Sequence, residues 1–412
     1  MKELSSGLPA IVIDGAKGVG KTRTASRLAA TTYSLMEHGV VEVLASDPEA
    51  VQDGTPPVLI DEWQRLPWIW DQVKTWVDQD PAPGRFLLTG SAIPQGTSLH
   101  SGAGRIVRLM MRPLSLAERG LAQPQVSLEQ LLKGQVDQVR GTCEVRLADY
   151  VQEIVGSGFP GIRPLPERVR EAALDGYLAA IVEREFPEQG LTVRKPHVLT
   201  SWLRAYAAAT ASTATYSTIL RAASPGQSDQ PASSTVLAYR DVLASLWMSD
   251  LVPAWSPAFT GLRNLGKAPK HFLADPALAA RLLHLSTSAL LRGETKVAPL
   301  GPQAGTLLGR LFESLVALSL QTYAAAARAS MSHLRTQRGE HEVDFVLERD
   351  FRVLGIEVKL SASVEDRDVG HLRWLASQWP ADDLTLVVLT TGREAYTRRD
   401  GIHVIPAALL GP

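Results

Sequence analysis

A glycine-rich segment near the N-terminus constrains the fold of this chain more than any other feature. Residues 15–22 read Gly-Ala-Lys-Gly-Val-Gly-Lys-Thr and fit the pattern G-x-x-x-x-G-K-[ST]. The strand-like run Ile11–Ile13 precedes this segment, and a helical pattern over Thr22–Met36 follows it. Glycines let backbone N–H groups curl around phosphate oxygens at the point where a helix begins. The pattern therefore predicts a phosphate-binding loop between a strand and a helix of an α/β domain.

The polar side chains of this loop have separate predicted tasks. Lys21 can reach the β- and γ-phosphates of a nucleotide, and the Thr22 hydroxyl can bind Mg²⁺. The alternative is a glycine-rich turn of no chemical use, but such a turn does not require a Lys-Thr pair between a strand and a helix. The predicted nucleotide-binding residues are Gly15, Ala16, Lys17, Gly18, Val19, Gly20, Lys21 and Thr22.

Two acids at the end of a second apolar run extend this predicted site. Val58–Ile60 reads as a buried strand, and Asp61 and Glu62 follow it directly. At the carboxyl edge of a parallel sheet, Asp61 lies beside the phosphates and can hold Mg²⁺ through water. Glu62 can polarise the attacking water as a catalytic base. The alternative is an ordinary strand that ends in two solvated acids.

A third run, Phe86–Leu88, is followed by Thr89, Gly90 and Ser91. A polar side chain at this position, with Ser91 as the candidate, can sense the γ-phosphate. A simple turn after the strand explains the same residues equally well.

An arginine at the start of a further strand is a candidate catalytic residue. Arg105 precedes Ile106–Leu109 and can act as an arginine finger across a subunit interface, which requires at least a dimer. Arg108 and Arg112 are rival candidates. For each of the three, an exposed structural arginine is the competing interpretation.

The alternation of strands and helices predicts a doubly wound parallel sheet over residues 1–114. The predicted strands are Ile11–Ile13, Val40–Leu44, Val58–Ile60, Phe86–Leu88 and Ile106–Leu109, and the predicted helices include Thr22–Met36 and Trp68–Asp78.

Residues 115–298 are predicted to be mainly helical. The expected helices are Ser115–Leu132, Val169–Glu185, Pro196–Ala211 and Ser234–Trp247, with a loop at Ser224–Ser234 and an extended segment at Asp250–Trp255. Helices followed by a short strand favour a winged-helix unit, although many all-helical lids share this pattern.

Composition excludes several classes of protein. The formal net charge is −1, so no overall field attracts nucleic acid or an anionic membrane, although a local basic patch stays open. The single cysteine, Cys143, excludes an internal disulfide and a cysteine-based metal site. No run approaches the ~20 apolar residues of a membrane span, and no signal peptide is recognisable. We therefore expect a cytoplasmic protein.

The order of these segments resembles an AAA+ ATPase. The resemblance narrows to a bacterial and archaeal ATPase family with a long C-terminal domain of unknown function. It rests on the P-loop and acidic strands and on the segments 104–106, 112–115, 158–161, 270–275 and 309–313. It implies ATP as the nucleotide, Mg²⁺ as the cofactor and hydrolysis as the reaction. It leaves the residues of the adenine pocket unassigned.

Residues 299–412 form a second predicted α/β unit that contains four charged candidates for a second site. The expected elements follow the order α-β-β-β-α-β: Leu307–Ala324, Met331–Leu334, Val343–Leu347, Leu354–Val358, Asp366–Ser377 and Leu384–Leu389. Glu313 lies on the helix, Asp344 on a strand, and Glu357 and Lys359 on the next strand. Strand residues two apart face the same side, so Glu357 and Lys359 are expected to point together.

An acid followed by E-x-K one strand later is typical of the restriction-endonuclease-like (PD-(D/E)XK) fold, and the family resemblance points to the same fold. In that fold the acids bind Mg²⁺ and the lysine helps to activate water. His341 and Arg338 lie nearby in sequence and could contact phosphates. The alternative is a degenerate nuclease core used for scaffolding or nucleic-acid binding.

Two functions follow from these patterns. In the first, an ATP-driven protein acts on DNA or is regulated by it, with the C-terminal domain binding or cutting the DNA. In the second, the chain is a nucleotide-regulated interaction switch with a protein partner, and its C-terminal domain is an inactive docking module. A homo-oligomer is compatible with both.

Overall fold

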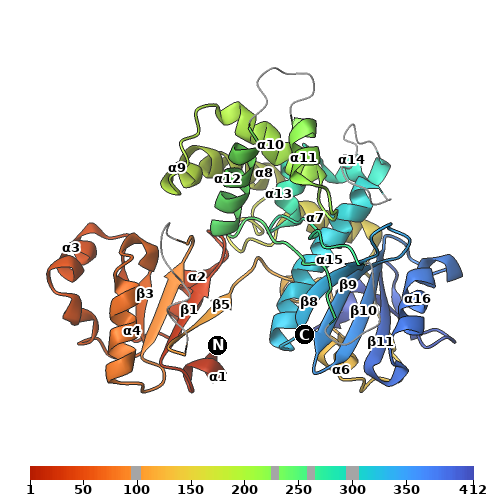
Figure 1. Cartoon of the computed structure of the whole chain (residues 1–412), viewed down its shortest axis with the longest axis horizontal. Helices are drawn as coiled ribbons and strands as arrows, with labels where there is room; N and C mark the ends of the chain where they lie inside the picture. The colour runs from red at the N-terminus through yellow and green to blue at the C-terminus, as the bar shows by residue number, and fades with distance from the viewer. Residues whose placement is uncertain (94–103, 224–231, 258–264, 294–305) are drawn as a thin grey trace.

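The computed structural model describes residues 1–93, 104–223, 232–257, 265–293 and 306–412. It has three parts: an N-terminal sheet domain, a helical middle region and a C-terminal sheet domain (Figure 1). In Figure 1 the two sheet domains lie apart at the lower left and lower right, and the helical region lies above and between them.

The N-terminal domain contains a five-stranded sheet in the order β2-β3-β4-β1-β5, and every neighbouring pair is parallel. The strands are β1 (Ala10–Asp14), β2 (Thr31–Ser34), β3 (Val58–Asp61), β4 (Phe86–Gly90) and β5 (Ile106–Met110), and the main helices are α2 (Lys21–Ala25), α3 (His38–Ser46) and α4 (Ile69–Gln79). Asp14 pairs in register with Gly90, and Asp61 pairs with Thr89. The carboxyl ends of β1, β3 and β4 therefore meet at one edge.

Two predicted elements of this domain are wrong. The predicted helix Thr22–Met36 ends at Ala25, and its second half contains the edge strand β2. The predicted strand Val40–Leu44 is part of helix α3. The physical reason is one-sided burial: Leu44 is buried but Val43 is 53% exposed, whereas a central strand must bury both faces. The β-branched and aromatic residues Thr31–Tyr33 favour a strand instead.

The middle region is a group of packed helices. They are α7 (Leu147–Gly156), α8 (Glu167–Ala180), a π-helical turn (Ile181–Glu185), α9 (Phe186–Glu188), α10 (Pro196–Ala208), α11 (Tyr216–Ala223), α12 (Ser233–Ser245), α13 (Pro276–Leu282) and α14 (Thr287–Arg292). The predicted extended segment 250–255 makes isolated bridges, among them Val252 to Lys270, rather than a full strand. The winged-helix assignment stays a prediction, and most of the predicted loop 224–234 lies outside the described residues.

The predicted helix Ser115–Leu132 is also wrong. It is divided into α5 (Leu116–Arg119), a short strand β6 (Val126–Ser127) and α6 (Leu128–Leu132). Gly120 ends α5 with a positive φ of 70°, which glycine adopts without strain. Strand β6 pairs with β14 (Leu410–Gly411), and β7 (Gly141–Thr142) pairs with β12 (Glu394–Thr397). Residues 115–298 therefore do not form one unit, because their first part packs on the C-terminal domain.

The C-terminal domain has a seven-stranded sheet in the order β7-β12-β13-β11-β10-β9-β8. Its principal elements are α15 (Leu307–Ala326), β8 (Ser330–Arg335), β9 (Glu342–Arg349), β10 (Arg352–Lys359), α16 (Gly370–Gln378), β11 (Leu384–Thr390) and β13 (His403–Pro406). Strands β8, β9 and β10 are antiparallel, while β10 and β11 are parallel. The observed element order is the α-β-β-β-α-β order expected from the sequence. The predicted domain boundary at 298/299 lies outside the described residues.

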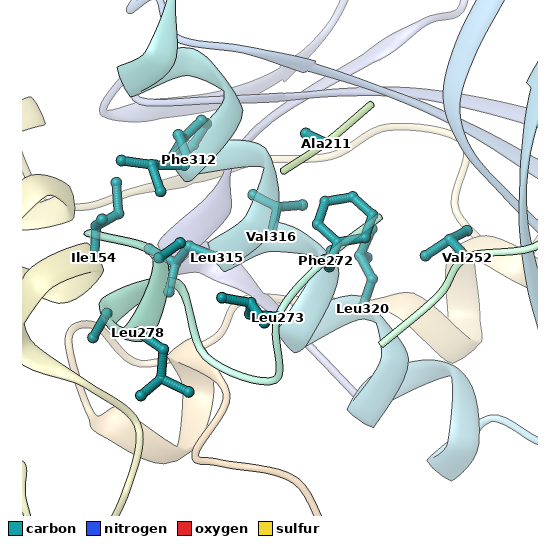
Figure 2. Close-up of a cluster of buried hydrophobic side chains, with 14 of the residues drawn as sticks. Ile154, Ala211, Val252, Phe272, Leu273, Leu278, Phe312, Leu315, Val316 and Leu320 are labelled. Carbon is teal, nitrogen blue, oxygen red and sulfur yellow. The ribbon is translucent and has the colours of Figure 1, made fainter. Parts of the chain in front are cut away.

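Helix α15 connects the sheet to the middle region through a shared core. Figure 2 shows side chains of α15 beside those of α7 and of the segment that leads into α13, with Ile154, Phe272, Leu273, Phe312, Leu315, Val316 and Leu320 labelled. These side chains are at most 5% exposed, and the cluster continues to Ala16 and Val19 of the glycine-rich loop. Close packing of this kind transmits small shifts, because interiors have few voids that absorb them. In the part of the chain that the structure describes, no helix combines the length and apolarity that crossing a bilayer demands.

Candidate functional site

The loop between β1 and α2 folds into a compact turn whose shape depends on its glycines. Gly15, Gly18 and Gly20 all have φ between 87° and 151°. A Cβ at Gly15 would lie 2.1 Å from the carbonyl oxygen of Met111, which no side chain tolerates. Lys21 is 4% exposed, and its ammonium donates to the carbonyl oxygens of Gly15 at 2.8 Å and Ala16 at 2.9 Å. Burial lowers the pKa of Lys21, and the carboxylate of Glu62 opposes this shift.

The two predicted Mg²⁺ ligands lie next to each other. The Thr22 hydroxyl donates to Asp61 Oδ1 at 2.7 Å, and the Thr89 hydroxyl donates to the same oxygen. Oxygen atoms of a hydroxyl and a carboxylate are the ligands that Mg²⁺ takes, together with phosphate and water. The residues present therefore fit a Mg²⁺ ion beside a nucleotide.

The predicted catalytic residues Glu62 and Ser91 are also in direct contact. Ser91 Oγ donates to Glu62 Oε2 at 2.7 Å. Gln64 is a residue that sequence reasoning missed. Its side-chain amide donates to the Glu62 carboxylate and, at 3.0 Å, to Ser91 Oγ. Glu62 has a φ of 58°, in the left-handed region. A glutamate held in that region costs of order 1–3 kcal/mol, and such residues cluster at functional sites.

A buried ion pair beneath the loop was not predicted. Asp14, the last residue of β1, is 2% exposed, and Arg108 Nε donates to its Oδ2 at 2.6 Å. Burial raises the pKa of Asp14, and the Arg108 guanidinium opposes that shift. Arg108 also lies over the Trp247 ring of the middle region, 5.4 Å from its centroid. No sequence pattern indicates this pair, because Asp14 has the position of an ordinary residue at a strand end.

The three candidate finger arginines all form ion pairs within the chain. Arg108 pairs with Asp14, Arg112 Nε lies 3.0 Å from Asp250, and Arg105 Nε lies 2.5 Å from Asp78. Arg105 precedes β5, and so it lies at the amino edge of the sheet, opposite the glycine-rich loop. A role for Arg105 in a neighbouring subunit stays a prediction.

The middle region covers the glycine-rich loop on one side. Lys17 Nζ lies 2.8 Å from Glu185 Oε1 on the π-helical turn, and the Tyr177 hydroxyl donates to the Lys17 carbonyl at 2.9 Å. A Cβ at Gly18 would lie 3.8 Å from the ring of Phe159. A cavity of about 340 Å³ lies at this junction, and Lys17, Ser91, Arg184 and Glu185 contribute its polar lining.

The four predicted residues of the C-terminal domain come together at one site. Lys359 Nζ lies 2.8 Å from Glu357 Oε1, so these two side chains do point together. Asp344 Oδ2 accepts the backbone N–H of Val358 at 2.9 Å, which fixes β9 and β10 at this point. Glu313 reaches the same place from α15. Of the two nearby candidates, His341 stacks on Trp374 with ring centroids 4.2 Å apart, and Arg338 is exposed.

Sequence reasoning missed the residue at the centre of this cluster. Lys270 has no exposed side-chain surface, and its ammonium lies 2.8 Å from Glu313 Oε1, 3.1 Å from Asp344 Oδ1 and 3.4 Å from Glu342 Oε1. Burial opposes the charge, but the three carboxylates outweigh it and raise the pKa of Lys270. Burial, with Asp344 nearby, raises the pKa of Glu313 to about 8. Among the described residues, no group of three or more His, Cys, Asp or Glu side chains is arranged to hold a metal ion.

Comparisons with protein families divide the chain in three. Residues 8–119 match the model of an AAA domain. Residues 147–289 and 308–410 match two domains of unknown function, DUF8612 and DUF4143 respectively. The model for 308–410 covers Glu313, Asp344, Glu357 and Lys359 without assigning them an activity.

Similar proteins occur in mycobacteria. Uncharacterized proteins of Mycobacterium tuberculosis and Mycobacterium bovis are each 24% identical over 369 residues, which span 86% of this chain and 71% of the relative. Among solved structures, the ORC2 protein of Aeropyrum pernix, in ADPNP and ADP complexes, aligns with 68% of this chain and 87% of its own. The TM-score is 0.28 at 15% identity, so nothing known of that protein is transferred to this one.

The parallel sheet, the glycine-rich loop with Lys21 and Thr22, and the acids of β3 all lie inside the segment that matches the AAA model. The N-terminal part of this chain, residues 8–119, therefore combines a match to the AAA domain model with a parallel sheet and a glycine-rich loop.

Proposed function

We propose that this chain binds ATP with Mg²⁺, hydrolyses it, and passes its nucleotide state to the middle region. One observation carries the proposal: the loop and the acidic strand meet, with Thr22 Oγ1 2.7 Å from Asp61 Oδ1 and Lys21 buried beside them. The same edge of the sheet carries Glu62 and Ser91 in contact. These contacts support roles for Lys21 in binding phosphate, for Thr22 and Asp61 as metal ligands, and for Glu62 as the base.

The residues of this edge divide the chemistry among them. Lys21 exchanges the carbonyls of Gly15 and Ala16 for the β- and γ-phosphates, since an ammonium binds charged phosphate more strongly than neutral carbonyls. Thr22 and Asp61 would hold Mg²⁺, which neutralises the charge that develops on the phosphates. Glu62 accepts the proton of the attacking water or orients that water, while Ser91 and Gln64 fix the position of its carboxylate.

The experiment that tests this function is ATP hydrolysis by the purified chain beside the Lys21→Ala variant. The variant is expected to lose hydrolysis and to bind ATP about ten- to a hundredfold more weakly, which corresponds to roughly 1.5–3 kcal/mol for a charge-assisted contact. Hydrolysis at the wild-type rate in Lys21→Ala would contradict the assignment. Circular dichroism of the variant checks that the fold is unchanged.

DNA is the partner that we propose first. The support is the C-terminal site, where Glu313, Asp344, Glu357 and Lys359 come together as expected for a restriction-endonuclease-like domain. DNA-stimulated, salt-sensitive hydrolysis would support this role. Lys359→Ala is expected to remove any cleavage of DNA in Mg²⁺ or Mn²⁺ and to leave ATP hydrolysis unchanged. Loss of hydrolysis in that variant would mean that Lys359 is structural.

The second candidate is a nucleotide-regulated switch that binds a protein partner through an inactive C-terminal domain. The observation in its favour is the buried Lys270, which already neutralises the carboxylates of that domain. Hydrolysis that DNA does not change, together with no cleavage, would favour this candidate. For both candidates we propose a cytoplasmic location and a homo-oligomer in which Arg105 reaches a neighbouring subunit.

A further inference from the structure

The acidic cluster of the C-terminal domain contains a cation that the chain itself supplies. Lys270 comes from the segment that precedes α13, outside the domain's own α-β-β-β-α-β core. Its side chain is fully buried, and all three nearest carboxylates lie within 3.4 Å of Nζ. An ammonium ion is strongly disfavoured in an apolar interior unless carboxylates surround it. The lysine and the carboxylates therefore stabilise each other.

The backbone fixes Lys270 in this position. Its N–H donates to the Val252 carbonyl at 2.9 Å, and its carbonyl accepts the Val252 N–H at 3.0 Å. The ammonium also lies 5.6 Å from the centroid of the Phe345 ring on β9. Lys359 differs from Lys270 in its exposure and in its partners. Its side chain is 29% exposed, and among the described carboxylates of the cluster it pairs with Glu357 alone. Lys270 occupies the centre of the cluster, and Lys359 lies at its rim.

The oxygens that Lys270 occupies are those that a metal ion would need. Glu313 Oε1 and Asp344 Oδ1 come from α15 and β9 and converge on one point, which Nζ fills. Divalent ions bind such oxygens at about 2.0–2.6 Å, so an ammonium and a metal ion cannot share this point. Glu357 offers one further oxygen to a metal ion. This residue is 5% exposed, and its Oε2 has no hydrogen-bond partner in the described part of the chain.

We propose that Lys270 is the resident cation of this cluster: it excludes divalent metal while it is in place, and its removal converts the cluster into a divalent-cation site formed by Glu313, Asp344 and Glu357. The inference concerns the C-terminal domain and does not depend on ATP hydrolysis. It sets a condition for the proposed action on DNA, because metal-dependent cleavage at these residues would first require Lys270 to leave.

Manganese binding to the full chain without nucleotide tests the proposal, with free Mn²⁺ followed by electron paramagnetic resonance. Five proteins are compared: wild type, Glu313→Gln, Lys270→Ala, Lys270→Ala with Glu313→Gln, and Lys267→Ala as a control at an exposed lysine of the same segment. We expect Lys270→Ala to gain about one Mn²⁺ per chain, with at least tenfold tighter binding than wild type. The added Glu313→Gln is expected to remove that gain, and Lys267→Ala should match wild type.

A folded Lys270→Ala variant that gains no Mn²⁺ overturns the proposal. A wild-type site that Glu313→Gln removes also overturns it, because the cluster would then bind metal with Lys270 in place. This second comparison uses a variant that keeps an oxygen for Lys270, so it can overturn the proposal even if Lys270→Ala fails to fold. Since no nucleotide is present, failure of the ATPase assignment would leave these outcomes unchanged.

Discussion

Glu62 combines strain, contact and position in a way that separates it from the other acids of the molecule. Its backbone has a φ of 58°, its carboxylate accepts from Ser91 and Gln64, and it follows directly after the strand that ends in Asp61. Its backbone N–H donates to Thr89 Oγ1 at 3.2 Å. The neighbouring strand thus holds both the backbone and the side chain of Glu62. Such preorganisation is what a base needs if it is to orient water without rearrangement.

Glu62→Gln should separate ATP binding from hydrolysis. Glutamine retains the size of the side chain and an oxygen for Ser91, but it cannot accept a proton at neutral pH. We expect ATP affinity within about twofold of wild type and a turnover reduced by about 10²–10⁴, the usual contribution of a general base. Isothermal titration and phosphate release measure the two quantities. Hydrolysis at the wild-type rate would show that another group activates the water.

At the scale of elements, the glycine-rich loop and the π-helical turn Ile181–Glu185 form one contact between the N-terminal domain and the middle region. π-Helical turns are rare and occur often at functional sites. Lys17 binds Glu185 in this structure, and we propose a phosphate of the nucleotide as its alternative partner. The carboxylate of Glu185 holds the pKa of Lys17 above its ordinary value. Binding of ATP can therefore release the turn.

Glu185→Gln should strengthen ATP binding for two reasons. Lys17 would no longer have to leave the Glu185 carboxylate before it binds a phosphate, and the change removes a negative charge near the phosphates. We expect about a fivefold gain, or roughly 1 kcal/mol. Lys17 is 63% exposed, so we expect little change in thermal stability from the lost pair. Glu183→Gln, an exposed change in the same turn, should leave ATP affinity unchanged. Weaker binding in Glu185→Gln would mean that the pair holds the loop in its binding shape.

The elements that the sequence predicts correctly are those with strong local signals. Strands β1, β3, β4 and β5 are short apolar runs between turn residues, and they occur where expected. Val40–Leu44 has the same local signal but forms a helix, because its position relative to the sheet decides which face is buried. The predicted site residues of β3 and β4 meet because parallel strands end at one edge. The sequence could not predict the ion pairs of Lys270 and Arg108, because only the tertiary fold brings their partners near.

At the scale of the whole molecule, the middle region is tied to both sheet domains by polar contacts as well as by the shared core. Arg112, just beyond the end of β5, pairs with Asp250, and Trp247 covers Arg108 of β5. On the other side, the His333 carbonyl of β8 accepts the Trp255 N–H at 2.7 Å. These contacts lie near the two candidate sites, the glycine-rich loop and the acidic cluster. Motion of the middle region on ATP binding would therefore reach the strand next to the acidic cluster.

His333 makes the second of these junctions sensitive to acid. The imidazole is 1% exposed, its Nε2 donates to the Ala268 carbonyl at 2.9 Å, and its Nδ1 has no partner among the described residues. Burial, with the nearby charge of Lys270, lowers the pKa of His333 from 6.5 to about 4. A second proton would place a charge where no acceptor receives it.

Protonation of His333 therefore opposes folding, and the sign of the pH effect follows from the lowered pKa. The unfolded chain takes up the proton near pH 6.5 and the folded chain only near pH 4, so stability is complete above pH 6.5 and declines as the pH falls towards 4. The slope is up to about 1.4 kcal/mol per pH unit, and the total is roughly 3 kcal/mol.

His333→Gln should flatten this decline, because glutamine can donate to Ala268 but does not titrate. Urea unfolding at pH 7.5 and pH 5 measures the difference, and His197→Gln, at an exposed histidine, should retain the full pH dependence. If His333→Gln loses as much stability as the wild type between these pH values, then the acid sensitivity of the molecule originates elsewhere. A flattened profile would locate it at the junction of the middle region with the C-terminal sheet, about one strand away from Lys270 and its carboxylates.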